Sequence, residues 1–467
     1  MSAALGSFGR IFSPAPHAIA PDAAVELLKS GRAKPSALLA FGNGRSYGDT
    51  CLNREGELVD MRRRAGIVSL DAEGGVLVAE AGTMLSDIIA AAAPHGLFPA
   101  VVPGTQHVTL GGAIANDIHG KNHHVAGTFG CHVLWLDLLR SDGRLRRCSA
   151  DEDRELFAAT IGGMGLTGLI LTAAIRLKRV GSPDVIEVRK PFRNIAHYLE
   201  LAAEADAENE YAVAWIDQLA GGSAAGHGVL LCGNHAEAGS RSSARAAPPR
   251  LGVPFTPPFT VLNRPAIRAF NAAYGWAKRR AAPAAPTGWQ SYFFPLDGVR
   301  DWNRLYGPRG LFQHQSVVPF EAAAEALPRM LAATRRAGQA SFLTVLKRFG
   351  PVRSPGLLSF PRPGYTLTLD FPNRGEETLR LLAELDAVAV GAGGAVNPYK
   401  DARMPPSVFE ASFPNWHELE AQRDPAFLSD FWRRTALRVN ATGTRLANPM
   451  EQTATPAADV PIWNTKL

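Results

Sequence analysis

The chain has 467 residues, a formal net charge of +6 at pH 7 and an isoelectric point near 9.2. This length exceeds what one ordinary hydrophobic core supports, so we expect two domains. A hydrophobic content of 46% with 20% charged residues is typical of a soluble globular enzyme, and the modest positive charge favours anionic partners without implying nucleic acid. The cysteines lie far apart with no CxxC pair, which argues against a structural zinc site or a disulfide framework and indicates reduced thiols: Cys51, Cys131, Cys148 and Cys232.

No targeting or anchoring segment is expected. The N-terminus lacks a basic segment followed by a continuous apolar core, so we predict no secretory signal. No apolar run approaches the length of about 18 residues that a membrane-spanning helix needs. We therefore expect the protein to be cytoplasmic or peripheral at the inner membrane.

A glycine-rich loop follows the first predicted helix and strand. The helix is expected over Pro21–Arg32 and the strand over Ala37–Phe41, and the loop Gly42–Asp49 comes next. The third glycine of a GxGxxG fingerprint would fall at Tyr47, and no helical pattern follows, so a Rossmann fold is not indicated. The loop can still wrap a pyrophosphate with its backbone amides, and a plain surface turn remains the alternative.

The next elements interleave without a regular alternation. Strands are predicted at Glu57–Asp60, Gly66–Asp71, Val76–Ala81, Val133–Leu139 and Leu169–Leu177, and a helix at Thr83–Ala93. Ser149 and Glu152 predict a capping box for a helix that ends at Thr160. A parallel βαβ sheet would need strict alternation, so an α+β fold is expected.

The segment Pro103–Gly130 is rich in glycine, threonine and asparagine and poor in large apolar side chains. We expect it to wrap a phosphate-bearing cofactor and to present His119 and Lys121 to a reaction centre. A metal cluster of its histidines is disfavoured, because Gly120 and Asn122 break any helix that would align them, and no carboxylate pair completes a site. His123 and His124 are expected to be hydrogen-bonded structural histidines, and a solvated loop lysine is the alternative for Lys121.

From about Val180 a second domain with a larger sheet is predicted. Its strands are expected at Ala212–Asp217, Val229–Cys232, Phe312–Pro319, Ser341–Phe349 and Tyr365–Phe371, and its helices near Glu321–Ala337 and Glu376–Val390. Within a basic segment, the helix Arg264–Arg280 places Ile267, Phe270, Tyr274 and Ala277 on one stripe. Such a helix can lie on an anionic membrane surface, and a half-buried helix in a solvated loop is the alternative. Further helices are expected at Pro406–Ser412, Trp416–Arg423 and Pro425–Thr435, before a polar tail that is partly disordered or draped over the surface.

Several blocks along residues 5–436 together resemble the vanillyl-alcohol oxidase / p-cresol methylhydroxylase flavoprotein superfamily, and within it the decaprenylphosphoryl-β-D-ribose 2′-oxidases. The blocks are GRSYGD (Gly44–Asp49), PGT with VTLGGAI (Pro103–Ile114), DIHGKNHH (Asp117–His124), AGTFG (Ala126–Gly130), GGMGLTG (Gly162–Gly168), AWID (Ala214–Asp217), WNRLYGPRG (Trp302–Gly310), QHQSVVP (Gln313–Pro319), LSFPRPG (Leu358–Gly364), LDFP (Leu369–Pro372) and YKDAR (Tyr399–Arg403). GRSYGD alone is a signature of the superfamily, whereas DIHGKNHH with the later YKD is far more specific.

The resemblance implies a two-domain α+β fold in which a substrate domain on an antiparallel sheet is inserted into a discontinuous FAD-binding domain. The FAD-binding domain is expected over residues 1–180 and 395–437, and the substrate domain over 181–394. The latter contains the basic, membrane-facing segment 236–288, and 438–467 form a tail. Tyr47 stands where covalent members of the superfamily often carry the flavin-linking histidine, so we expect non-covalent FAD.

The resemblance also assigns site residues. The catalytic ones are His119, Lys400 and Tyr47, and the substrate-binding ones are Lys121, Trp215, Gln313, Gln315, Lys347 and Thr368. The cofactor-binding ones are Gly44, Arg45, Ser46, Tyr47, Gly48, Asp49, Pro103, Gly104, Thr105, Thr109, Gly111, Gly112, Asn116, His119, Gly120, Asn122, Gly165, Gly168, Ile170 and Lys400. No metal is implied.

General chemistry suggests a role for each group. Lys400 can stabilise the negative charge of a reduced flavin, and His119 can relay the proton of a hydroxyl, with Tyr47 beside it. Lys121 and Lys347 are expected counter-ions of a substrate phosphate. Gln313 and Gln315, two apart on a strand, are expected to face the same side and to bind sugar hydroxyls.

Two positions depart from the family pattern. Thr368 replaces the pocket cysteine that covalent inhibitors attack, which removes a thiol but no catalytic group. Phe293 stands near the place of a pocket tyrosine, which can alter the fit of the substrate.

The expected activity is oxidation of the 2′-hydroxyl of a polyprenylphosphoryl-β-D-ribose to its 2′-keto form. That step is the first half of an epimerisation, which a NAD(P)H-dependent keto-reductase partner completes to give an arabinose donor for cell-wall or glycan synthesis. The alternatives are an FAD-linked alditol or aldonolactone oxidase that acts on a free sugar and a non-catalytic polyprenyl-phosphate-binding protein.

Overall fold

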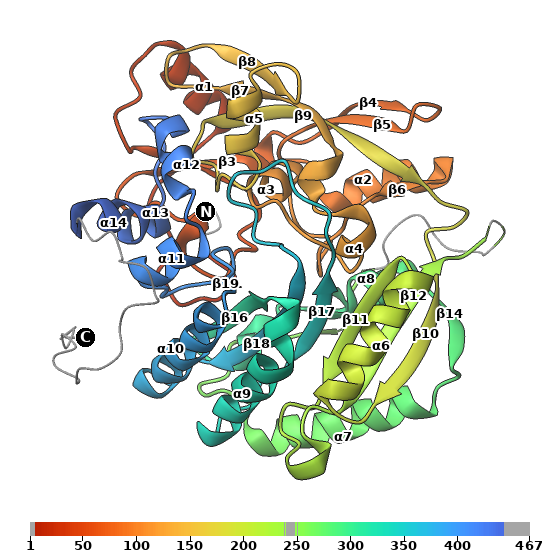
Figure 1. The fold of residues 1–467 in the computed structure, drawn as a ribbon. Coiled ribbons are helices and arrows are strands. Elements are labelled where there is room, and N and C mark those ends of the chain that lie inside the picture. Colours follow the sequence, from red (N-terminus) through yellow and green to blue (C-terminus); the bar gives the residue numbers. More distant parts are fainter. Residues whose placement is uncertain (1–4, 238, 240–247, 250, 443–467) are drawn as a thin grey trace.

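The structure is a computed structural model that describes residues 5–237, 239, 248–249 and 251–442. In Figure 1 the N-terminal elements lie above a large sheet built from the middle of the chain, and the C-terminal helices return to the side of the N-terminal elements. The fold is of the α+β type, with helices packed on mostly antiparallel sheets.

The first third of the chain forms two sheets. A small parallel sheet has the order β1 (Ala18–Ile19), β3 (Glu57–Asp60) and β2 (Leu38–Phe41). The larger antiparallel sheet runs β4 (Ile67–Asp71), β5 (Val76–Glu80), β9 (Leu169–Arg179), β7 (Val133–Leu139) and β8 (Leu145–Ser149), with β6 (Leu97–Pro99) also paired to β9. The helices here are α1 (Pro21–Lys29), α2 (Leu85–Ala92), α3 (Leu110–Ala115), α4 (His123–Ala126) and α5 (Arg154–Thr160).

The middle of the chain forms an eight-stranded antiparallel sheet. Its order is β14 (Ala284–Thr287), β10 (Val185–Phe192), β12 (Gly228–His235), β11 (Tyr211–Ile216), β17 (Val345–Phe349), β18 (Gly364–Pro372), β16 (Leu311–Val318) and β19 (Ala395–Val396). The accompanying helices are α6 (Ile195–Glu208), α7 (Arg264–Arg280), α8 (Trp289–Phe293), α9 (Ala323–Arg336) and α10 (Glu376–Gly391). A separate pair of short parallel strands is β13 (Leu251–Gly252) with β15 (Val299–Arg300).

The two faces of this sheet have different neighbours. In β18, Leu367, Leu369 and Phe371 are buried in the hydrophobic cluster that also contains the apolar faces of α6, α9 and α10. Since side chains alternate along a strand, Thr368 lies on the opposite face, where it lines a cavity. One face therefore builds the core, and the other carries polar groups into the cavity.

The C-terminal segment packs back on the first third of the chain. It contains α11 (Pro406–Ser412), α12 (Trp416–Gln422), α13 (Asp430–Arg434) and α14 (Ala436–Thr442). The Leu38 amide donates to the carbonyl of Ala426 at 2.9 Å, and the Leu428 amide donates to the carbonyl of Leu38 at 3.1 Å. This bridge brings the two ends of the chain together. Of the predicted tail, 438–442 belong to α14, and 443–467 lie outside the described residues.

The predicted capping box at Ser149 is wrong. The Ser149 hydroxyl accepts from the amides of Asp151 and Glu152, at 3.1 and 3.0 Å, and so closes a turn before the helix. Helix α5 begins later, after Asp153, which has a left-handed φ of 48°. The same local hydrogen bonds that cap helices also form such turns.

The helix predicted over Arg264–Arg280 is confirmed as α7, but its apolar stripe is only partly buried. Ile267 is buried, whereas Phe270 is 38% exposed, and the polar Asn271 is 3% exposed. The helix packs against β10 and β12. Tertiary contact, rather than hydrophobicity alone, selects its inner face.

Three further elements differ from expectation. Strand β10 and helix α6 fill the stretch after Val180 for which no element was predicted. The helix predicted over Pro425–Thr435 is shorter, because Phe427 pairs with Leu38 and helical structure starts only at α13.

No described helix combines the length and the hydrophobicity that crossing a membrane requires.

Candidate active site

A cavity of about 500 Å³ lies between the glycine-rich loops of the first third and the polar face of the eight-stranded sheet. Ligand and cofactor sites usually have volumes of about 300–1,000 Å³. Its walls come from segments far apart in sequence, including the loop after β2, the segment before and after α3, strands β11, β16, β17 and β18, helix α7 and residues 397–400.

The loop after β2 forms one wall. Gly44 has a φ of 58°, and a Cβ there would lie 2.4 Å from a backbone carbonyl, so only glycine fits. Among the described residues, the backbone amides of 43–46 find no acceptor. The Asn43 Nδ2 atom donates to the carbonyl of His107 at 2.8 Å and ties this loop to the second one. Successive unpaired amides of this kind bind anions such as phosphate.

The second loop leads into α3. Thr109 is the N-cap of this helix, and its Oγ1 accepts from the Gly112 amide at 3.2 Å. A Cβ at Gly42 would lie 2.5 Å from the same Oγ1, so the two loops approach closely only because position 42 is glycine. The loops therefore form one continuous backbone-lined wall.

His119 stands where the loops meet the sheet. Its Nδ1 lies 3.1 Å from Lys347 Nζ on β17, and its Nε2 lies 3.0 Å from Gln315 Nε2 on β16. A protonated imidazole carries a hydrogen on both ring nitrogens and has no acceptor. Donor groups beside both nitrogens therefore disfavour the protonated form of His119. Burial, followed by the positive charge of Lys347, holds the pKa of His119 well below its usual range. The ring is therefore neutral at physiological pH.

Three lysines line the same cavity with lowered pKa values. Burial and the neighbouring charges of Lys121 and Lys400 lower the pKa of Lys347 to about 7. Burial lowers the pKa of Lys121 to about 7, against the opposing effect of Glu187. Burial lowers the pKa of Lys400 to about 8, although Asp370 acts in the other direction. Their protonation states therefore respond to a bound anion near neutral pH.

Lys400 is held against the loop after β2. Its ammonium lies 4.6 Å from the centroid of the Tyr47 ring. The Tyr47 amide donates to the carbonyl of Tyr399 at 3.2 Å. A Cβ at Gly48 would lie 1.7 Å from the carbonyl oxygen of Asp401, so the two backbones touch. Residues from opposite ends of the chain thus share one corner of the cavity.

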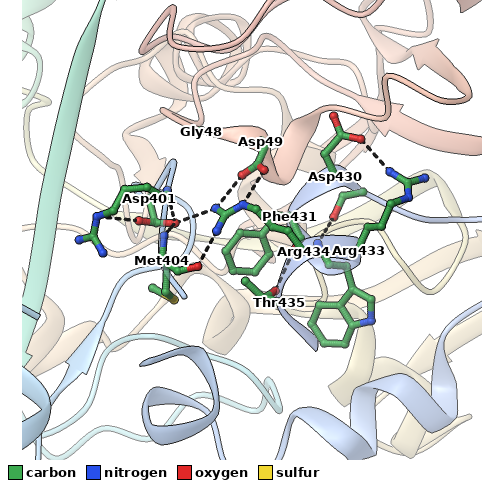
Figure 2. Close-up of polar contacts among 12 residues, drawn as sticks. Gly48, Asp49, Asp401, Met404, Asp430, Phe431, Arg433, Arg434 and Thr435 are labelled. Carbon is green, nitrogen blue, oxygen red and sulfur yellow. Dashed lines mark hydrogen bonds and ion pairs between the residues drawn. The ribbon is translucent and has the colours of Figure 1, made fainter. Parts of the chain in front are cut away.

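Figure 2 shows the ion pairs of Arg434 with Asp49 and Asp401, which lie outside the cavity next to the segments of Tyr47 and Lys400. The Arg434 guanidinium donates to both carboxylate oxygens of Asp49, at 2.7 and 2.9 Å, and to Asp401 Oδ2 at 2.8 Å. It also donates to the Met404 carbonyl at 2.6 Å. Arg434 therefore joins the residues that follow Tyr47 and Lys400 without reaching the cavity itself.

The comparisons with known proteins agree with this geometry. A family model described as an FAD binding domain matches residues 20–149. The chain is 34% identical over 414 residues to the decaprenylphosphoryl-β-D-ribose oxidase of Mycolicibacterium smegmatis, which covers 86% of this chain and 89% of that protein. The chain belongs to the decaprenylphosphoryl-β-D-ribose oxidase family.

Two other relatives match parts of the chain. An uncharacterized protein in the mprA 5′ region of Streptomyces coelicolor is 35% identical over 365 residues, 74% of this chain and 97% of that protein. Cytokinin dehydrogenase 7 of Oryza sativa subsp. japonica is 33% identical over 184 residues, 37% of this chain and 35% of that protein. Like other members of this oxidase family, the chain is an FAD-dependent oxidoreductase, and the sequence-based predictions of superfamily, α+β fold, enzyme class and FAD are confirmed.

The residues in the cavity fit FAD. The unpaired amides of 43–46 and the Arg45 side chain suit a pyrophosphate, and Gly104 leaves open space beside its backbone. Apolar side chains in the same walls suit flat aromatic rings: Ala40, Met61, Met164 and Ile170. Cationic Lys400 lines the same cavity and is available for a ring that becomes negative on reduction. Non-covalent attachment stays a prediction.

Most residues that the resemblance assigned to the site line this one cavity. These are all nine predicted catalytic and substrate-binding residues and all but three of the predicted cofactor-binding residues. Phe293 also lines it, next to a tyrosine, Tyr292, that the prediction did not place there. Gln313 and Gln315 do face the same side, as their spacing predicted.

Three predicted cofactor residues do not line the cavity: Gly48, Asp49 and Asn122. Gly48 packs against the Asp401 backbone, and Asp49 is paired with Arg434. Asn122 is fully buried, and its Nδ2 donates to the carbonyl of Ala100 at 2.8 Å. These three residues pack behind the residues that line the cavity and hold them in place.

The neighbouring histidines have structural surroundings. His124 Nε2 lies 2.9 Å from the Asn209 carbonyl, as expected for a hydrogen-bonded histidine. The same prediction is wrong for His123, whose ring nitrogens find no partner among the described residues and whose ring lies 4.7 Å from that of Phe349. Burial lowers the pKa of His123 to about 4, so the ring is neutral. Within the described parts of the chain, no group of three or more His, Cys, Asp or Glu residues is arranged to hold a metal ion.

Sequence reasoning missed three groups that belong to the site. Gln313 Nε2 donates to Asp370 Oδ1 at 2.5 Å, and burial raises the pKa of Asp370 to about 7. Asn397 Nδ2 donates to Gln315 Oε1 at 2.9 Å and fixes that amide beside the imidazole. Lys278 of α7 also lines the cavity. The alternation Thr366-Leu367-Thr368-Leu369-Asp370 is the one signal that would have placed Asp370 on the polar face.

Proposed function

We propose that this oxidase removes two electrons from the 2′-hydroxyl carbon of a polyprenylphosphoryl-β-D-ribose and releases the 2′-keto sugar. The observation that carries the proposal is the placement of a neutral His119 and of Lys400 in one cavity with the glycine-rich loops. The substrate is taken from the name of the Mycolicibacterium smegmatis relative, which aligns with most of this chain.

In this proposal His119 receives the hydroxyl proton. A neutral imidazole can accept a proton, and its contact with Lys347 gives that proton a second carrier whose pKa is about 7. Gln315 holds the ring from the other side, and Asn397 fixes Gln315. When bound, FAD supplies the acceptor for the carbon-bound hydrogen, which leaves as hydride.

Lys400 supplies positive charge to the same end of the cavity. Its ammonium is held above Tyr47 and faces Asp370, which keeps part of its charge balanced before a ligand binds. Charge that is already in place stabilises developing negative charge without reorganisation. Gln313 is bound to Asp370 and can orient a sugar hydroxyl from the sheet.

The division into domains and the biological role form part of the proposal. Residues 1–180 and 395–437 would hold FAD, and 181–394 would bind the substrate, a division supported by the bridge between Leu38 and residues 426–428. A NAD(P)H-dependent keto-reductase would then reduce the 2′-keto sugar to the arabinose epimer, a donor for cell-wall or glycan synthesis.

Peripheral membrane contact is also proposed, because a lipid-linked substrate resides at a membrane. Large apolar side chains are exposed in and before α7, namely Leu251, Phe255, Phe259, Phe270 and Trp276. Exposed arginines of α7 accompany them. An apolar surface with basic neighbours suits an anionic membrane surface.

The test is anaerobic reduction of the FAD-loaded protein, followed by the loss of flavin absorbance. Farnesylphosphoryl-β-D-ribose should bleach the flavin in one turnover, and free ribitol should not. Bleaching by ribitol with no response to the phosphoryl ribose would instead support a free-sugar oxidase. A protein that holds no FAD and binds farnesyl phosphate would support the non-catalytic alternative.

A further inference from the structure

Helix α7 reaches into the cavity, although its sequence predicts a surface helix. Lys278, near its C-terminal end, lines the cavity, and its side chain is 23% exposed. The ring of Tyr274, one turn earlier, lies 4.9 Å from the Trp215 ring on β11. The helix is therefore attached to the cavity wall by an aromatic pair and presents one ammonium beside it.

The charges at this end of the cavity are unbalanced. Glu187 on β10 is 3% exposed, and its Oε1 lies 2.7 Å from Arg189 Nε and 3.1 Å from Lys278 Nζ. One carboxylate thus faces two cations. Lys121 adds a third cation, whose ammonium donates to the Tyr292 carbonyl and lies 4.4 Å from the Tyr292 ring centroid. The group carries a surplus of positive charge when all its members are ionised.

The surplus lies next to the proposed reaction centre. Lys121 is two residues from His119, and two residues span at most about 7 Å of backbone. A sugar whose 2′-hydroxyl contacts His119 carries its phosphate on the adjacent carbon. The phosphate therefore falls within reach of the side chain of Lys121, on the side of α7.

We infer that Lys121 and Lys278 form the subsite for the monoanionic phosphodiester of the substrate, with Trp215 and Tyr274 as its wall. This inference rests on the proposed function and deepens it. Lys347 is left with a different task, since its ammonium contacts Nδ1 of His119 and the carbonyl of Gly120. Lys278 is then a specificity-determining residue that separates phosphorylated from free sugars.

The simpler alternative is that Lys278 only balances Glu187. Lys278→Met tests the two views, because Arg189 still pairs with Glu187 and the fold is expected to persist. Lys278→Arg keeps the charge. Lys29→Met, at the exposed end of α1, removes one positive charge far from the cavity and serves as the matched control.

The first measurement is calorimetric titration of the FAD-loaded protein with farnesyl phosphate, which needs no turnover. Lys278→Met should weaken binding about tenfold to a hundredfold, the range for losing one charged partner, whereas Lys278→Arg and Lys29→Met should stay near wild type. Farnesol should bind weakly and equally to all four proteins. Equal affinity of wild type and Lys278→Met for farnesyl phosphate would overturn the inference. Inorganic phosphate that binds as tightly as farnesyl phosphate, with the same dependence on Lys278, would also overturn it, because the site would then serve free phosphate.

The second measurement is anaerobic flavin reduction by farnesylphosphoryl ribose. The substrate concentration for half-maximal rate should rise by the same factor in Lys278→Met, while the limiting rate stays within about twofold of wild type. A lower limiting rate at unchanged half-saturation would count against a binding role. If wild type is not reduced by this substrate at all, the proposed function fails, and the calorimetric result still decides the subsite.

Discussion

The guanidinium of Arg434 makes two hydrogen bonds to the carboxylate of Asp49, across 385 positions of the sequence. The same guanidinium bonds to Asp401, which follows Lys400. Asp49 in turn lies two residues after Tyr47, and the Lys400 ammonium lies over the ring of Tyr47. Arg434 therefore joins the segment that follows Tyr47 to the segment that follows Lys400, through Asp49 and Asp401 (Figure 2).

Arg434→Met should destabilise the protein strongly. It leaves the side chains of Asp49 and Asp401, which are 1% and 3% exposed, without their main cation. Breaking a buried ion pair from one side typically costs about 3–5 kcal/mol. The measurement is urea unfolding of the FAD-loaded protein. Arg433→Met on the same helix is the control, since its partner Asp430 keeps Arg54 at 2.6 Å and the loss should be smaller. Equal losses for the two variants would contradict the assigned role.

Lys400 should determine how the rate constant of flavin reduction falls at high pH. Its pKa is lowered to about 8, so the ammonium is charged below that pH and neutral above it. The rate constant of anaerobic flavin reduction should therefore fall as pH rises through about 8. Lys400→Arg should flatten this basic limb of the pH profile, because a guanidinium stays charged, and Lys400→Ala should abolish turnover in a folded protein. Near-normal turnover of Lys400→Ala would refute the role.

Asp370→Asn should change stability in a pH-dependent way. The carboxyl ionises near 3.8 when unfolded and at about 7 when folded, because burial disfavours the charge. Between these values the folded state binds more protons at Asp370, so the contribution of this carboxyl to stability is fully present below pH 3.8 and is lost as pH rises through about 7. The melting temperature of Asp370→Asn relative to wild type should thus be higher at pH 8 than at pH 4.5.

Asp370→Asn should also lower the pKa of Lys400. Asp370 raises the pKa of that ammonium, so its removal should move the basic limb of flavin reduction to lower pH. A limb that does not move would show that the two charges do not interact.

Thr368→Cys should introduce a reactive thiol into the cavity. Thr368 is 8% exposed and lines the wall beside Val345 of β17. The native thiol in the cavity, Cys51, has a pKa raised to about 12 by burial, so it forms little thiolate. Iodoacetamide should label the variant with one equivalent more than wild type, measured by intact mass, and farnesylphosphoryl ribose should slow the labelling. Labelling unaffected by this ligand would place the thiol outside the substrate path.

The exposed apolar side chains before and within α7 should govern membrane contact. The triple variant Phe255→Ser, Phe259→Ser and Trp276→Ser should reduce cosedimentation with anionic liposomes at least tenfold. Its activity on a soluble farnesyl substrate should change little. Val68→Ser, which removes a side chain that is 62% exposed on β4, is the control. Equal loss of liposome binding in the control would argue against a specific surface.

The sequence by itself was sufficient to predict the local features of this oxidase. The glycines of Gly42–Asp49 and of Pro103–Gly130 predicted backbone that approaches a ligand closely, and both segments line the cavity. The two-residue period of a strand correctly placed Gln313 and Gln315 on one face. The ends of α7 also followed from local composition.

Only the tertiary structure decided which of these local features meet. Asp370 becomes a partner of Lys400, Arg434 of Asp49, and Lys278 a part of the cavity, because folding brings together residues that sequence spacing does not relate. The buried face of α7 was likewise decided by its contact with β10 and β12, because the apolar stripe alone did not show which side chains become buried. Charge pairing and burial depend on distances in space, and a periodic pattern carries information only about one segment at a time.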